Sequence, residues 1–236
     1  MQKNMQKKIR TYSEVVRSVL IASKQKTISE PVRRAIDTVY TYIDNPMVLK
    51  NLELIESPFS SSQKRVRCKL AHVLISFLSF TDFSSFRIGV AKKEHLSPVM
   101  HRSIISRYKK ITGEDIKRST YFRMIKKLTK SKYLCSEAMN VVDSNDEGEK
   151  VIRGRAGYKW FTSAFFKDLN FKDTYVIEQR RYALAQLVKK HLSNVFPVWF
   201  SRTAVTNALL RNRTEAFTTT STQGQFDTDQ QLNLYH

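Results

Sequence analysis

Residues 115–132 place cations on one side of an expected helix and apolar side chains on the other. Arg123, Lys126, Lys127 and Lys130 recur at spacings of three, four and seven, and residues so spaced are neighbours on a helix surface. No acidic residue occurs from 116 to 132 to balance them. Arginine can pair in a bidentate way with guanine, whereas lysine more often contacts phosphate. The pattern predicts a nucleic-acid recognition helix, and a merely solvated helix face is the simpler alternative.

Other cations and hydroxyls border this stripe along the sequence. At the start of the same helix, Ser119 and Thr120 are expected to touch the DNA backbone, and Lys117 and Arg118 add two further cations. The first turns of a helix expected over 64–80 add Lys64, Arg65 and Arg67, and a later strand adds Arg153, Arg155 and Lys159. Together with the stripe, these residues form the predicted DNA-binding set.

The apolar face of the predicted recognition helix consists of Phe122, Ile125 and Leu128, with Tyr121 and Met124 beside them. Asp115 stands where an N-cap is expected, because Asp is among the residues preferred there. Hydrophobic residues at helical spacing are buried in most proteins. We therefore expect this face to pack against a core.

Motifs of enzymes are absent from the sequence. It has no phosphate-binding G-x-x-x-x-G-K-[ST] loop, no G-x-S-x-G and no H-E-x-x-H. The five histidines do not stand at metal-ligand spacing, and two cysteines, Cys68 and Cys135, are too few for a disulfide framework. We expect no enzyme, no metal and no cofactor, with inert thiols in a reducing, intracellular compartment.

Composition points to a folded protein with a polyanionic partner. The chain has 236 residues, of which 41% are hydrophobic, and 41 Lys and Arg against 21 Asp and Glu give a net charge of +20. Residues 63–132 hold 18 Lys and Arg against four acids, so +14 of that charge lies in this stretch. Neutralising phosphates releases counterions, which drives association. No run of 18 apolar residues occurs, and we expect no membrane partner.

The order of expected elements is that of a winged helix. After the helix over 64–80 come a short strand at 86–90, helices over 97–112 and 115–132, a strand over 135–143, an acidic turn, and a strand over 150–162. The predicted fold is mainly α with a small β-hairpin: a winged helix-turn-helix DNA-binding domain with additional flanking helices. The second helix of such a pair enters the major groove, and the hairpin is the wing.

Five regions divide the chain. We expect an exposed basic N-terminal arm, including Arg10, with a short helix over 1–28, an N-terminal helical region over 29–62, the winged-helix domain over 63–172, C-terminal helices over 173–213, and a disordered polar tail over 214–236. Tyr158, Trp160 and Phe161 would suit a stacking platform for single-stranded nucleic acid. Packing of Trp160 and Phe161 onto the domain is the favoured interpretation.

Three stretches give a resemblance to a known family. They are 31–37 (PVRRAID), 86–90 (FRIGV) with 116–120 (IKRST) after the next helix, and 161–166 (FTSAFF). Over about two thirds of its length the chain resembles bacterial plasmid replication initiators of the RepA (IncFII-like) type. It departs from them in its C-terminus, which is rich in Thr and Gln and not in Arg.

The resemblance implies a protein of the bacterial cytoplasm, associated with the plasmid or nucleoid. Such initiators bind double-stranded DNA at the plasmid origin, help to open an AT-rich segment and recruit host replication proteins. Homodimers and monomers often have different roles among them. Two other functions stay open on the residues alone: a winged-helix transcriptional regulator, and an RNA-binding or interaction protein that uses the basic surface.

Overall fold

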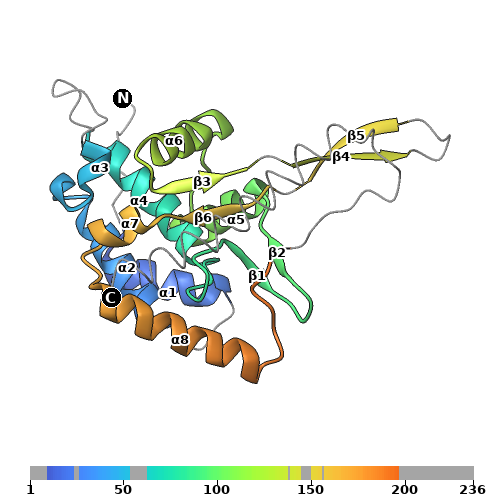
Figure 1. Ribbon diagram of the computed structural model, residues 1–236. Coiled ribbons are helices and arrows are strands. Elements are labelled where there is room, and N and C mark those ends of the chain that lie inside the picture. The colour runs from blue at the N-terminus through green and yellow to red at the C-terminus, as the bar shows by residue number, and fades with distance from the viewer. Residues whose placement is uncertain are drawn as a thin grey trace. The chain divides into compact units, whose positions relative to one another are not determined.

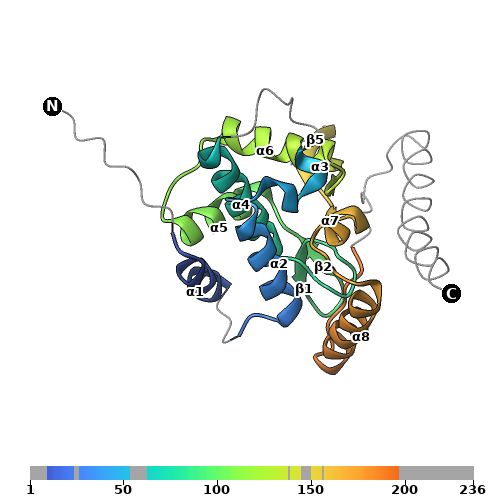
Figure 2. The same ribbon diagram turned by 90° about the vertical axis from the view of Figure 1, so that its left-hand side faces the viewer.

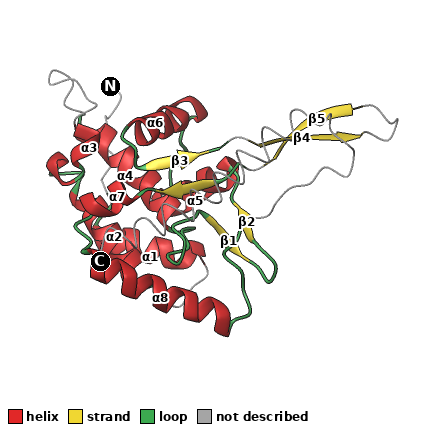
Figure 3. Cartoon of the chain, in the orientation of Figure 1, coloured by secondary structure: helices red, strands yellow, loops and turns green. Residues whose placement is uncertain are grey.

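The computed structural model describes residues 10–23, 27–53, 63–137, 139–144, 150–155 and 157–196 (Figure 1). The chain divides into two compact units. The first comprises residues up to 138 together with 156–197, and the described part of the second is a hairpin within Met139–Arg155. The described chain is mainly helical, as the sequence predicts, with short strands (Figure 3).

The helices of the described chain all belong to the first unit. They are α1 (Tyr12–Ser23), α2 (Glu30–Thr41), a 3₁₀ turn η1 (Pro46–Val48), α3 (Lys50–Glu53), α4 (Lys64–Leu78), α5 (His101–Thr112), α6 (Arg118–Lys130), α7 (Ser163–Asp168) and α8 (Asp173–Lys189).

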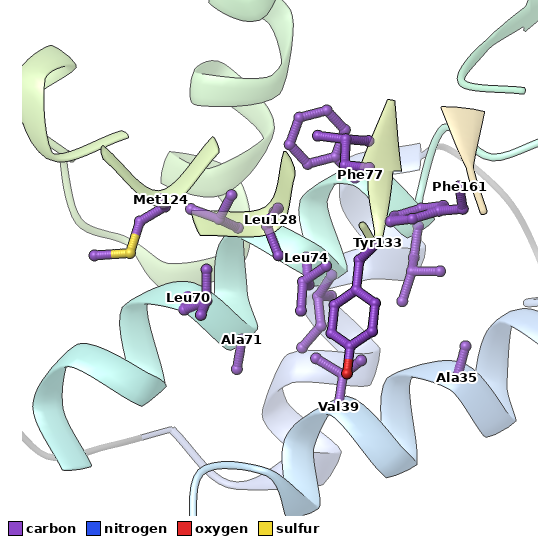
Figure 4. Packing of buried hydrophobic residues seen from close by; sticks show 14 of the residues in the cluster. Ala35, Val39, Leu70, Ala71, Leu74, Phe77, Met124, Leu128, Tyr133 and Phe161 are labelled. Atoms are coloured by element: carbon purple, nitrogen blue, oxygen red, sulfur yellow. The ribbon is translucent and has the colours of Figure 1, made fainter. Parts of the chain in front are cut away.

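Helix α4 is the centre of the core. Every residue from 70 to 78 is buried, so its C-terminal half is enclosed on all sides. A helix that is enclosed in this way needs neighbours around it, and α2, α5 and α6 contact it (Figure 2). Figure 4 shows its side chains between those of α2, such as Val39, and those of α6, such as Leu128.

The strands of the first unit form two small antiparallel pairs. Strand β1 (Gly89–Ala91) pairs with β2 (Leu96–Pro98), and β3 (Leu134–Ser136) pairs with β6 (Lys159–Phe161). Residues 86–88 also lie along β6: the amide of Ile88 donates to the carbonyl of Lys159 at 2.8 Å, and the amide of Phe161 donates to the carbonyl of Phe86 at 3.0 Å. Strand β6 therefore has β3 as one neighbour and the segment 86–88 as another.

The second unit contains an antiparallel hairpin of β4 (Met139–Ser144) and β5 (Lys150–Arg155). Its register runs from Met139 opposite Arg155 to Ser144 opposite Lys150. The acidic turn between the strands lies outside the described residues. The sequence predicted two continuous strands over 135–143 and 150–162, but the structure divides this region into two separate strand pairs.

Two predicted helix starts are wrong by several residues. Helix α5 begins at His101 and not at Ser97, because 96–98 pairs with β1 instead. Helix α6 begins at Arg118, with Lys117 at its N-cap. Asp115 does not cap it; its carboxylate accepts a hydrogen bond from the Nζ of Lys109 at 2.9 Å. At α5, strand pairing with β1 replaces the expected first turn of the helix. At α6, the contact with Lys109 replaces the expected N-cap.

At the C-terminal side, α8 ends at Lys189, four residues before the predicted end. The expected C-terminal helices over 173–213 are described only as far as 196. The tail over 214–236 and most of the expected N-terminal arm lie outside the described residues. Among the helices that the structure does describe, none is both long and apolar enough to cross a membrane.

Candidate nucleic-acid interface

Helix α6 has one buried face and one cationic face. Tyr121, Met124, Ile125 and Leu128 are buried in the core that α4 organises. The opposite face is exposed and presents Lys117, Arg118, Ser119, Arg123, Lys126 and Lys130, with Lys127 and Thr120 half-buried at its margins. The predicted stripe is thus brought together on one surface. The four buried side chains fix the rotation of α6 about its axis, so the cations on its other side are exposed.

Phe122 is an exception to the predicted apolar face. Its side chain is 38% exposed, and Tyr121 takes the expected place in the core. The ring lies 5.2 Å from the ring of His101, and the guanidinium carbon of Arg118 lies 5.6 Å from its centre. The spacing 121, 124/125, 128 would have identified the buried face correctly. One exposed aromatic ring, that of Phe122, therefore accompanies the cations at the start of α6.

A hydrogen bond joins the starts of α5 and α6. The Nδ1 of His101 and the hydroxyl of Tyr121 lie 2.8 Å apart. Burial, and then the nearby charges of Lys159 and Arg118, lower the pKa of His101 to about 4. The imidazole is therefore neutral at pH 7 and positions α6 without adding charge. Sequence reasoning missed this contact, since 20 residues separate the partners and neither stands in a recognisable motif.

The turn between the two helices depends on Gly113 and on a residue from the N-terminal region. Gly113 caps α5 with a left-handed φ of 75°, a conformation that glycine adopts without strain. Nη1 of Arg10 donates to the carbonyl of Ile111 at 2.6 Å and to the hydroxyl of Ser18 at 2.9 Å. Arg10, expected in an exposed arm, is instead a half-buried cap on the end of α5.

Lys159, predicted to contact DNA, is a buried structural residue. Only 1% of it is exposed, and its Nζ donates to the carbonyls of Val99 at 3.0 Å and Gly157 at 2.9 Å. Burial lowers the pKa of this amine from 10.5 to about 8. The prediction for Lys159 is wrong because a cation on the returning strand points into the space before α5, where two carbonyls need a donor.

The predicted cations on the first turn of α4 are partly engaged within the protein. Nε of Arg67 donates to the carbonyl of Ile43 at 2.9 Å, and Arg67 is half-buried, so this side chain holds the segment after α2. Lys64 forms an exposed ion pair with Asp44. Arg65 is exposed.

The last two predicted contacts belong to the other unit. Arg153 and Arg155 lie in β5, where their backbones face Val141 and Met139 of β4.

The aromatic residues after the hairpin pack inside the first unit. Phe161 is buried and stacks on Phe165 with ring centres 4.4 Å apart, and buried Tyr158 stacks on Phe196 at 4.3 Å. Trp160 is half-buried and bridges to Arg87 through the backbone. The packing interpretation is confirmed for Phe161, and Tyr158 is not available as an open stacking platform.

The histidine and cysteine side chains that could be reactive are buried or half-buried. His72 is buried, and desolvation lowers its pKa to about 4, while burial raises the pKa of the neighbouring Cys68 thiol. Both cysteines are free and half-buried. Across the described ranges, no three His, Cys, Asp or Glu side chains gather where they could hold a metal ion. A raised thiol pKa disfavours the reactive thiolate.

Comparison with family models, with curated proteins and with solved structures gives no match for this chain. The geometry of the α6 surface is therefore the main basis for a functional conclusion.

Proposed function

We propose that this chain is a non-enzymatic, sequence-specific double-stranded DNA-binding protein of the winged-helix type, whose α6 enters the major groove. The observation that carries the proposal is the exposed face of α6, where Arg118, Arg123, Lys126 and Lys130 stand together. No acid occurs on this helix to neutralise them. The major groove admits an α-helix and displays a distinct pattern for each base pair.

The arrangement around α6 supports the winged-helix part of the proposal. Helices α5 and α6 are joined by the Gly113 turn and fixed by the bond between His101 and Tyr121. Behind them, 86–88, β6 and β3 lie side by side, and the β4–β5 hairpin is inserted in the chain between β3 and β6. A helix pair followed by two paired strands with a hairpin between them is compatible with the winged-helix order of two helices, a strand, a turn and a strand.

The side chains of α6 fall into two groups: one suited to phosphate contacts, which position a protein on DNA, and one suited to base contacts, which read the sequence. Ser119 and the first amides of α6 are suited to phosphate, as helix N-termini are. Arg123 and Lys126 lie one turn further along, where base edges would be reached. Exposed Phe122 offers an apolar contact of the kind that a thymine methyl group accepts. A good bidentate pair between a side chain and a base contributes about 1–3 kcal/mol of discrimination.

Fluorescence anisotropy with duplex DNA tests the proposal. Duplexes tiling the DNA that flanks the gene would be compared with scrambled duplexes at two salt concentrations. R123A/K126A should abolish most of a site preference of about a thousandfold. The control K167A/K172A removes the same charge from exposed lysines near α7 and should lower affinity equally for all sequences. Equal, steeply salt-dependent binding of both duplex sets by the unaltered protein would contradict sequence-specific recognition.

We further propose, on the resemblance to RepA-type proteins, that the bound duplex is a plasmid origin and that binding opens it within the bacterial cytoplasm. Permanganate reactivity of thymines in the bound duplex tests this step. Reactive thymines support an initiator, and a closed duplex supports a transcriptional regulator instead. Tighter binding of structured RNA than of duplex DNA at equal salt would move the function to RNA.

A further inference from the structure

A cationic hollow lies beside α5, apart from the exposed face of α6. It has a volume of about 390 Å³ and is lined by Phe80, Arg102, Ser103, Ser106, Arg107 and Lys110. Five of the six come from α5, at spacings that place them on adjoining helical rows. The lining thus holds two guanidinium groups, one ammonium group and two hydroxyls, with no carboxylate among the described residues that form it.

Arg107 is held in place inside this hollow. Its guanidinium carbon lies 4.4 Å from the centre of the Phe80 ring, a cation–π contact that fixes a long side chain. Its Nη1 is buried and has no hydrogen-bond acceptor among the described residues. A guanidinium held by stacking is pre-organised, so less conformational freedom is lost when it binds an acceptor.

The other two cations are open to solvent. Arg102 and Lys110 are exposed, and no described carboxylate pairs with either of them. Three unneutralised cations and two hydroxyls offer more hydrogen-bond donors than the two oxygens of one carboxylate can accept. A phosphate group has enough acceptor oxygens, and arginine forks match its geometry.

We propose that this hollow is a second binding site, separate from the α6 surface, and that its ligand is a phosphate group. Arg107 forms its fixed wall, Arg102 and Lys110 neutralise the charge, and Ser103 and Ser106 donate hydroxyl hydrogens. The phosphate comes either from the backbone of a bound polynucleotide or from a free phosphate compound. A polynucleotide backbone as the source rests on the proposed function, whereas a free phosphate compound does not.

Titration with inorganic phosphate tests the site itself. Amide signals of Ser103 and Ser106 would be followed by NMR, with chloride added at matched ionic strength as the comparison. Saturable shifts with phosphate alone are expected. R102M/K110M should weaken binding roughly tenfold or more, because two charge-assisted contacts are lost. K167M/K172M, which removes the same charge elsewhere, should leave it unchanged.

A second variant separates a built site from general charge. R107K keeps the charge but loses the planar fork and its stacking on Phe80. Phosphate binding should fall in R107K although the net charge is unaltered, and circular dichroism would verify the fold. If it does not fold, the exposed pair R102M/K110M still decides the matter, since neither side chain is part of the core.

The dependence of duplex affinity on salt identifies the source of the phosphate. If a backbone phosphate occupies the hollow, R102M/K110M should lower the slope of log K against log salt by about 0.9 per lost contact relative to K167M/K172M. Equal slopes, together with phosphate shifts, assign the site to a free phosphate compound.

The absence of saturable shifts, with equal slopes, would overturn the proposal. If no duplex binds but phosphate does, the proposed function fails and this site stands.

Discussion

Lys159 and Arg123 have similar sequence contexts, yet one is enclosed and the other is exposed. Both are cations within runs that also contain apolar residues. Helical spacing assigned Arg123 to the outer face because its neighbours in the turns above and below are polar. For Lys159, the outcome depends on the carbonyls of Val99 and Gly157, and Val99 is 60 residues away in the chain. Periodicity reveals a face, but it carries no information about a distant acceptor.

Replacing Lys159 with Met should change how stability responds to pH. The folded protein holds this amine at a pKa of about 8, below the ordinary 10.5, so the unfolded chain binds more protons between these values. Stability contributed by the neutral amine is therefore full above pH 10.5 and is lost as pH falls toward 8. Urea unfolding at pH 8 and pH 10 should show wild type gaining about 2 kcal/mol relative to Lys159→Met. A parallel pH response in the two proteins would contradict this.

His72 should make the fold sensitive to acid. It is buried with a pKa of about 4, and its Nε2 has no acceptor among the described residues. The unfolded chain takes up a proton near pH 6.5, so stability falls as pH drops from 6.5 to 4. Relative to His72→Met, wild type should lose about 3 kcal/mol across this range, measured by denaturant unfolding. The same measurement on His101→Gln tests the other histidine whose pKa is lowered by burial.

At the scale of elements, the sequence predicted the helices well but not all of their starts. The core stripes of α2, α5 and α6 repeat at helical spacing, so their existence follows from pattern. The start of α5 does not, because residues 96–98 could extend the helix but pair with β1 instead. The predicted strand at 86–90 is likewise divided, with 86–88 along β6 and 89–91 along β2. These choices depend on partners that are remote in sequence.

Gly113→Ala should destabilise the junction between α5 and α6. A left-handed φ costs a residue with a Cβ about 1–2 kcal/mol, and the added carbon would lie 2.7 Å from Nη2 of Arg10. The expected loss is at least that large in thermal or urea unfolding. In an Arg10→Met background the contact disappears while the backbone cost stays. The effect of Gly113→Ala should then be smaller, and an undiminished effect would show that Arg10 yields freely.

At the scale of the first unit, α8 is attached through arginines and not through a buried apolar face. None of its residues is fully buried. Nε of Arg180 donates to the carbonyl of Ser84 at 3.1 Å, and its guanidinium lies over Phe86. Arg87 in turn donates to the carbonyl of Asn194 at 3.2 Å and lies over Phe196. The loop that carries 86–88 to β6 is therefore held by the C-terminal segment.

Arg180→Ala should lower the stability of the whole unit, and Arg181→Ala should not. The first change removes a hydrogen bond and a cation–π contact, about 1–2 kcal/mol together. Arg181 is the adjacent residue and is exposed, so it controls for charge and helix propensity. Thermal unfolding should give a midpoint lower by several degrees for Arg180→Ala alone. Equal midpoints would mean that α8 contributes little to holding the loop.

The cap that Arg10 provides for α5 joins two residues that are 101 positions apart. During synthesis at about 5–20 residues per second, Arg10 is added to the chain roughly 5–20 seconds before the carbonyl of Ile111 exists. For that interval, the buried side chains of α1 have no final neighbour in α5. Arg10 can therefore engage only late, so the contact between α1 and α5 forms after α2 and α4 have already been synthesised.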